Sequence, residues 1–179
     1  DIIPSDEKIH AEIMYNKYDI FRNLFMYYFL AGLLFFIFII LNIFSENKSI
    51  HNFMKYIFII FRSSIVLLFI AHTLGLIARW YISGHAPWGD AYESMIYVAW
   101  ATMGIGLLFI KKSDLTLAST SFVTSMILMI AHWNWMDPSI ANLVPVLNSY
   151  WLMIHVSVIV GSYGPFALSM ILGFVSLLL

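Results

Sequence analysis

Two histidines and three tryptophans lie within the stretch AHWNWMDPSIANLVPVLNSYWLMIHV, residues 131–156. Trp151 and His155 are four residues apart, so on a helix they would share one face, about one turn apart. A histidine at the edge of a membrane span usually faces a partner or a cavity, and neutral imidazole is a common ligand of metal ions, including haem iron. The spacing therefore makes His155 a candidate ligand. The alternative is an interfacial histidine that only forms hydrogen bonds.

The other aromatic and imidazole side chains have simpler explanations. Tryptophans are enriched at membrane interfaces, where they form an aromatic belt. Such a belt would explain Trp133, Trp135 and Trp151 without any ligand. His85 lies in a short loop and His132 at the end of an apolar run, and their roles stay open. No predicted span carries two histidines about four turns apart, the pattern of a b-type membrane cytochrome, so we expect His72 to donate a hydrogen bond between packed helices.

The composition indicates a membrane protein. Hydrophobic residues make up 61% of the 179 residues and charged residues 11%, far from a soluble globular domain. A net charge of −1 gives no reason to expect nucleic acid as a partner. Cysteine is absent, which excludes disulfides and thiolate ligands in this chain. Any metal chemistry here would have to use His, Asp, Glu or Met.

Five hydrophobic segments are long enough to cross a bilayer, which takes roughly 20 residues as a helix. We expect an all-α, polytopic transmembrane bundle with spans at about 24–44, 56–77, 91–110, 115–131 and from 149 or 150 onward. Among the short loops, those at 79–92 and 132–149 hold a single arginine, whereas five positive residues fall on the other side: Lys48, Lys55, Arg62, Lys111 and Lys112. Because positive charge marks the cytoplasmic side, both tryptophan-bearing loops are predicted to be extracytoplasmic.

Local signals predict where several helices begin and pack. Asp90 and Glu93 have the spacing of a capping box that starts a helix at Ala91. Asp137, Pro138, Pro145 and Asn148 are expected to shape turns, with an interfacial turn of helix at 139–144. In the fifth span, Ser157, Gly161, Gly164 and Ala167 would favour close helix packing. We interpret Gly164-Pro165 as a kink that neighbouring helices tolerate.

Two longer runs, RWYISGHAPWGDAYESMIYVAW (79–100) and HWNWMDPSIANLVPVLNSYWLMIHVSVIVGSYG (132–164), carry a family resemblance. They resemble the SGH-x-P-x-x-x-x-YES and LVP-x-L-x-S-x-WL-x-x-HV-x-x-x-x-x-SYG blocks of the CcsA/ResC family, the System II cytochrome c biogenesis proteins. The resemblance covers about residues 53–179. Residues 1–50 would fit the end of the partner subunit CcsB/ResB with its last transmembrane helix, and 51–179 the first part of a CcsA/ResC-like domain.

The resemblance implies a holocytochrome c synthase in the bacterial inner membrane. Such a protein exports haem b and attaches it to the CXXCH motif of apocytochrome c on the periplasmic side. His155 matches the first of two extracytoplasmic histidines that act as axial ligands to haem iron, and Trp151, Trp133 and Trp135 would lie near the haem. The family's tryptophan-rich WWD motif and its second such histidine do not occur in residues 1–179, so we expect this chain to be part of a larger protein.

Two other classes of function fit the residues alone. One is a non-catalytic membrane scaffold that positions a partner, which would use the small residues of the fifth span for helix packing. The other is a transporter or a quinone-linked subunit, in which Gly164-Pro165 would mark a broken helix. A haem absorption spectrum of the full-length protein would distinguish the synthase from both.

Overall fold

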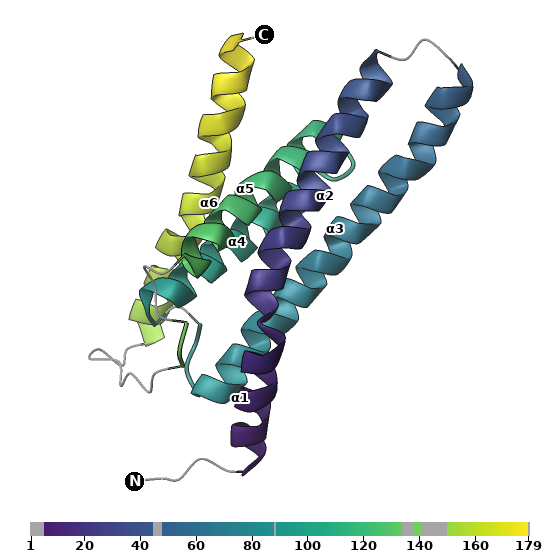
Figure 1. Ribbon diagram of the computed structural model, residues 1–179. Coiled ribbons are helices and arrows are strands. Elements are labelled where there is room, and N and C mark those ends of the chain that lie inside the picture. Colours follow the sequence, from purple (N-terminus) through teal and green to yellow (C-terminus); the bar gives the residue numbers. More distant parts are fainter. Residues whose placement is uncertain (1–5, 45–47, 88, 134–137, 141–149, 179) are drawn as a thin grey trace.

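The computed structural model describes residues 6–44, 48–87, 89–133, 138–140 and 150–178. These residues form six helices and no strand (Figure 1). The helices are α1 (Asp6–Tyr18), α2 (Ile20–Ile43), α3 (Lys48–Ser83), α4 (Ala91–Leu108), α5 (Asp114–His132) and α6 (Tyr150–Leu178). The predicted all-α membrane bundle is confirmed.

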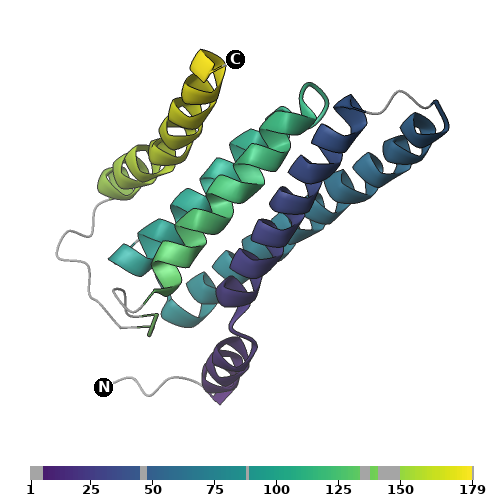
Figure 2. The same cartoon turned by 45° about the horizontal axis from the view of Figure 1, so that its top comes forward.

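The helices form a row in which each long helix packs on its neighbours. Helix α5 packs against α2 on one side and α4 on the other, α4 also packs against α6, and α2 packs against α3. Figure 2 accordingly shows α6 at one edge, α4 and α5 in the middle, and α2 and α3 at the opposite edge. The helix that carries His155 therefore lies at the edge of the bundle, with α4 as its main support.

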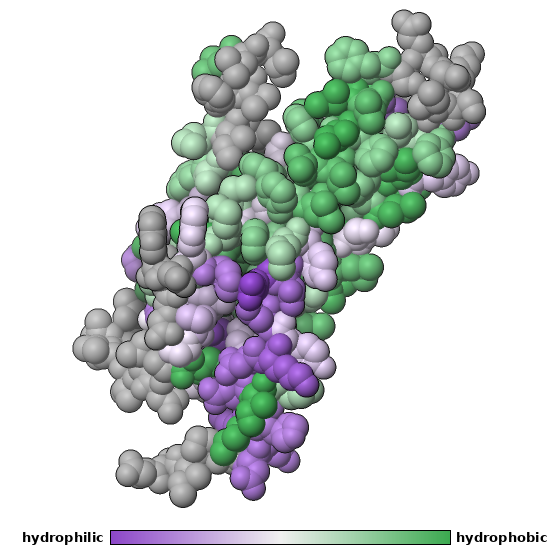
Figure 3. Space-filling model, in the orientation of Figure 1, coloured by the Kyte–Doolittle hydropathy of each residue, from purple (hydrophilic) through white to green (hydrophobic). Residues whose placement is uncertain are grey.

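Three helical stretches are long and apolar enough to cross a membrane: 6–43, Asn52–Ser83 and Asp114–His132. Helix α6 adds a shorter apolar stretch, Ile154–Met170. The predicted spans at 91–110 and 115–131 correspond closely to α4 and α5. Helix α3 is longer than the predicted 56–77 because polar residues outside the hydrocarbon can continue a helix that hydropathy alone would end. Figure 3 shows apolar side chains over α2 and α3, and polar ones over α1.

Helix α1 meets α2 at Asp19, whose left-handed backbone (φ 39°) interrupts the helix for one residue. Aspartate is one of the few residues that adopt this conformation readily, which explains why the break falls there. Sequence reasoning began the first span at 24 and missed α1, because α1 is polar and lacks a strong apolar face.

Small residues let α2 and α5 approach closely. A β-carbon added to Gly32 would lie 2.9 Å from the backbone nitrogen of Phe122 and 3.1 Å from the carbonyl oxygen of Ala118. Nearby, the Ser121 hydroxyl donates a hydrogen bond to the carbonyl of Tyr28 at 2.9 Å. Lipid tails are as apolar as leucine, so helices in membranes associate through such close packing and hydrogen bonds.

The ends of α3 and α5 and the starts of α4 and α6 lie together at the lower end of the bundle in Figure 1. This arrangement places the segments flanking 84–90 and 133–149 on one side, as the sequence predicts. At the opposite end, the Arg62 guanidinium donates two hydrogen bonds to Asp114, at 2.7 and 2.9 Å. Ser113 caps α5 there by accepting from the backbone N–H of Thr116 at 3.1 Å.

Candidate functional site

His155 lies on an exposed face of α6, at a shallow, open and almost entirely apolar hollow of about 580 Å³ whose lining residues all belong to α6. Trp151, Ile154 and Val158 line the hollow with it. The side chains of Trp151 and His155 are both exposed, and Trp151 keeps 77% of its surface accessible. The two residues thus share one face of α6, as their spacing predicts. An accessible imidazole beside apolar and aromatic surface suits a planar, apolar ligand that carries a metal.

The position of α6 is fixed by close contact with α4. A β-carbon added to Gly164 would overlap the Thr102 hydroxyl, and one added to Gly161 would lie 3.6 Å from the Tyr97 ring and 3.8 Å from Ala101. Pro165 follows directly, and α6 continues through it without interruption. The predicted packing role of Gly161 and Gly164 is therefore confirmed, and α4 supports the helix that presents His155.

The start of α4 has the predicted cap. Asp90 Oδ1 accepts a hydrogen bond from the backbone N–H of Glu93 at 2.7 Å. In return, Glu93 Oε2 accepts from the backbone N–H of Gly89 at 2.7 Å, one residue earlier than in the usual capping box. The Glu93 side chain is only 1% exposed, however, and its other oxygen serves a contact that capping does not explain.

That contact is a buried ion pair with Arg79. The Arg79 Nε–H donates to Glu93 Oε1 at 2.9 Å, and the Arg79 side chain is fully buried. Its two terminal nitrogens donate to the carbonyl oxygens of Pro138 at 2.9 Å and Ser139 at 3.2 Å. The guanidinium also stacks over the Tyr92 ring, 5.0 Å from its centroid. One side chain thereby joins the end of α3, the start of α4 and the segment between α5 and α6.

Sequence reasoning missed this network, because it treated Arg79 as one loop charge and Glu93 as a cap. A single arginine in two outer loops that hold no other lysine or arginine, close to the carboxylates of Asp90 and Glu93, was the available signal. Buried charges must be paired, so an arginine at the end of an apolar span should be matched to the nearest carboxylates. Asp90 Oδ2 also lies 3.7 Å from an Arg79 nitrogen, which adds a second negative charge to the cluster.

His85 belongs to this charged cluster. Its Nδ1 lies 3.1 Å from the carbonyl oxygen of Ala86 and 3.8 Å from Glu93 Oε2. Since a carbonyl can only accept, Nδ1 is the donor in the hydrogen bond to Ala86. Nε2 is buried and has no hydrogen-bond partner among the residues that the structure describes. His85 is not among the residues that line the hollow around His155.

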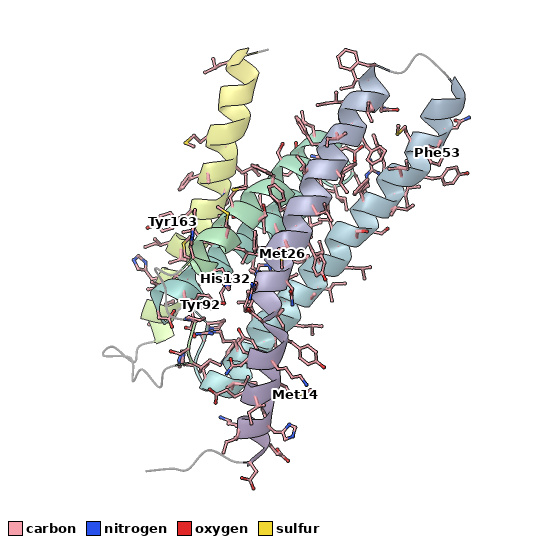
Figure 4. All side chains as sticks on the ribbon, viewed as in Figure 1. Met14, Met26, Phe53, Tyr92, His132 and Tyr163 are labelled. Carbon is pink, nitrogen blue, oxygen red and sulfur yellow. The ribbon has the colours of Figure 1, made fainter. Side chains whose placement is uncertain are left out.

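His132 ends α5 with an exposed side chain and lines a different hollow, of about 290 Å³. Tyr92 lies close to it in Figure 4, and Pro138, Ser139 and residues at the junction of α1 and α2 complete the lining. Trp133 follows His132 and is 60% exposed. Neither residue is among those that line the hollow at His155. Trp135 and the turn residues Asp137, Pro145 and Asn148 lie outside the described residues.

His72 has the predicted packing role. Its buried ring places Nε2 3.1 Å from the carbonyl oxygen of Ile96, which links α3 to α4. The rings of Phe21 and Tyr28 lie against it, with centroids 5.4 and 6.1 Å away. His72 therefore contributes to the interior of the bundle. No group of three His, Cys, Asp or Glu residues that could hold a metal ion occurs within the described ranges.

Comparison of the sequence with known proteins identifies a family and several relatives. The family described as cytochrome C assembly protein matches residues 88–179. Protein NrfI of Wolinella succinogenes is 40% identical over 173 residues, which are 97% of this chain and 19% of that protein. The cytochrome c biogenesis protein CcsA of Prochlorococcus marinus strain MIT 9515 is 33% identical over 147 residues, 74% of this chain and 43% of that protein. CcsA of Lotus japonicus is 32% identical over 116 residues, 58% of this chain and 33% of that protein.

The chain thus spans about a fifth of NrfI and less than half of these CcsA proteins. The family match includes α4, α5 and α6, and so includes Asp90 and Glu93 of the buried cluster and the hollow at His155, whereas Arg79 and His85 lie before it. Both halves of the resemblance seen in the sequence thus lie in or next to the matched region. This chain is a helical membrane protein that belongs to the cytochrome c assembly protein family.

Proposed function

We propose that this chain acts in cytochrome c biogenesis, as part of a larger protein that exports haem and attaches it to apocytochrome c. The observation that carries the proposal is the exposed imidazole of His155 beside Trp151 in an apolar hollow at one end of α6. The family supports the biological role, and the hollow supports haem as the molecule handled. The site would face the periplasmic side of the bacterial inner membrane.

The described residues suit one half of a haem site. His155 would supply one axial nitrogen to the iron, and Trp151, with Ile154 and Val158, would contact a face of the porphyrin. A second histidine from the rest of the protein would complete the pair. Covalent attachment adds each cysteine S–H of the CXXCH motif across a haem vinyl group, which forms a C–S and a C–H bond without net oxidation. The chain's part is to hold and orient the haem for that addition.

The chain would combine two parts of such a synthase. Residues 1–50 would correspond to the end of a CcsB/ResB-like part and residues 51–179 to the first part of a CcsA/ResC-like domain. The NrfI match extends over 97% of the chain and so includes both of these parts. The remaining CcsA portion, the CcsB/ResB-like portion and apocytochrome c would be its partners.

The proposal is tested with the full-length protein that carries His155→Gly. We expect loss or a shift of the haem bands in the reduced-minus-oxidised spectrum, loss of cytochrome c maturation, and recovery of both on addition of imidazole. His10→Gly is the matched control, because His10 is also an exposed helical histidine but lies on α1. Equal spectra and equal maturation in the two variants would show that His155 is no ligand and would favour a scaffold role.

A further inference from the structure

A further hollow, of about 320 Å³, lies at the opposite end of the bundle from His155. It is a half-open hollow between the last turn of α2 and the first half of α3. Four of its lining side chains are polar, namely Asn42, Asn52, Lys55 and Arg62, and apolar side chains such as Phe58 and Ile59 complete it. A cavity with two cations and an apolar wall suits an amphiphile with a negative head.

The depth of this hollow follows from the two arginines of α3. Arg79 is 17 positions after Arg62, a rise of about 26 Å along the helix. The hydrocarbon core of a bilayer is about 30 Å thick, so this spacing suits a helix that crosses it with one guanidinium group near each boundary. Lys55 is seven positions before Arg62, about 10 Å further out. With α3 placed in this way, the hollow would extend from the edge of the hydrocarbon into the layer that phospholipid head groups occupy.

Two polar side chains that line the hollow lack an ion-pair or hydrogen-bond partner among the described residues. Arg62 is paired with Asp114, but Lys55 is exposed and forms no ion pair with any residue that the structure describes. Asn42 Oδ1 is buried and has no hydrogen-bond partner within the described part of the chain. An unpaired buried acceptor is costly, so a ligand that donates a hydrogen bond there would be favoured. The site thus offers a cation for an anionic group and an acceptor for a hydroxyl.

We infer that this hollow binds the head group of an anionic phospholipid that carries a hydroxyl, of the phosphatidylglycerol type. Its phosphate contacts Lys55 and the outer side of Arg62, its hydroxyl donates to Asn42, and its acyl chains follow the apolar wall at Phe58 and Ile59 into the bilayer. Lys48 and Lys55 in the first turns of α3, with Lys111 and Lys112 after α4, give the same end of the bundle the positive bias typical of a cytoplasmic face. The bound lipid would hold the ends of α2 and α3 together.

The test compares Lys55→Gln with Lys111→Gln in the full-length protein. Both changes remove one exposed charge at the same end of the bundle, but Lys111 does not line the hollow. Each protein is placed in nanodiscs of phosphatidylcholine with or without phosphatidylglycerol, and retained lipid is measured by native mass spectrometry. We expect Lys55→Gln to bind phosphatidylglycerol about fivefold more weakly than Lys111→Gln, the effect of one lysine near a membrane surface.

Two further measurements make the outcome decisive. Asn42→Leu should also lower phosphatidylglycerol retention, because it removes the acceptor while keeping the side-chain size. Inorganic phosphate alone, added to phosphatidylcholine nanodiscs, should not raise the melting temperature as phosphatidylglycerol does. Equal lipid retention by Lys55→Gln and Lys111→Gln would overturn the proposal, and so would stabilisation by phosphate alone. The haem spectrum of Lys55→Gln should match that of the unaltered protein, so failure here is distinguishable from failure of the haem assignment.

Discussion

Arg79 and Glu93 form an ion pair with 2.9 Å between Nε and Oε1, and their side chains are 0% and 1% exposed. The arginine extends the contact to the carbonyl oxygens of Pro138 and Ser139. Through these bonds, the segment that leads toward α6 is attached to the start of α4. The pair therefore joins the two loops at the end of the bundle where His155 lies.

Removing Arg79 should destabilise the protein strongly. Arg79→Gln leaves the Glu93 carboxylate buried without its counter-charge, which costs about 3 to 5 kcal/mol in buried pairs. Arg62→Gln is the control, because the Arg62–Asp114 pair is 37% and 21% exposed and such pairs contribute about 1 kcal/mol or less. Thermal unfolding in detergent should show the larger fall in melting temperature for Arg79→Gln.

The double variant tests the cause of that loss. Glu93→Gln in the Arg79→Gln protein removes the uncompensated charge, while the neutral amide oxygen can still accept from the Gly89 N–H. Part of the lost stability should return. A double variant less stable than Arg79→Gln alone would show that the charge of Glu93 is not the reason, and equal losses for Arg79→Gln and Arg62→Gln would contradict the importance of burial.

The effect of the N-cap hydrogen bond of Asp90 should be separable from the effect of its negative charge. Asp90→Ala removes the acceptor for the Glu93 N–H and should cost about 1 kcal/mol, the usual effect of losing an N-cap. Asp90→Asn keeps an acceptor oxygen and should cost less. Ser113→Ala at the start of α5 is a matched cap removal that lies away from Arg79. If Asp90→Asn were as damaging as Asp90→Ala in thermal unfolding, the charge near Arg79 would matter more than the cap.

Helix α6 should tolerate a methyl group at one glycine and not at another. Gly164→Ala would push a β-carbon into Thr102, and overpacking of this kind costs about 1 to 3 kcal/mol. Gly173→Ala, in the same helix, meets nothing within 4 Å and should be neutral or slightly stabilising. Adding Thr102→Ala should relieve part of the Gly164→Ala loss. Similar melting temperatures for the two alanine variants would show that α4 and α6 do not pack as closely as described.

His72 and His155 should respond differently to substitution. His72→Gln keeps an N–H donor near the Ile96 carbonyl, so the haem spectrum of the full-length protein should not change. The variant should lose about 1 kcal/mol of stability, because glutamine fills the aromatic pocket of Phe21 and Tyr28 less well than imidazole. Loss of the haem bands in His72→Gln would mean that its role is more than packing.

Much of the fold could be predicted because membrane helices are encoded locally. Long apolar runs predict α2, α4, α5 and α6, and the Asp90 and Glu93 spacing predicts where α4 begins. The shared face of Trp151 and His155 follows from helical periodicity alone. These features depend on residues within a turn or two of one another, so the sequence by itself determined them.

The long-range pairs were decided only by the tertiary structure. Arg62 meets Asp114 across 52 positions, and Arg79 reaches Ser139 across 60, so no local spacing links them. The separate hollows of His132 and His155 likewise depend on where α5 ends and how α6 packs on α4. The amino-acid sequence shows which side chains are polar and at what spacing they recur. Which of them become neighbours depends on how helices approach one another, and that is settled by close packing at residues such as Gly164.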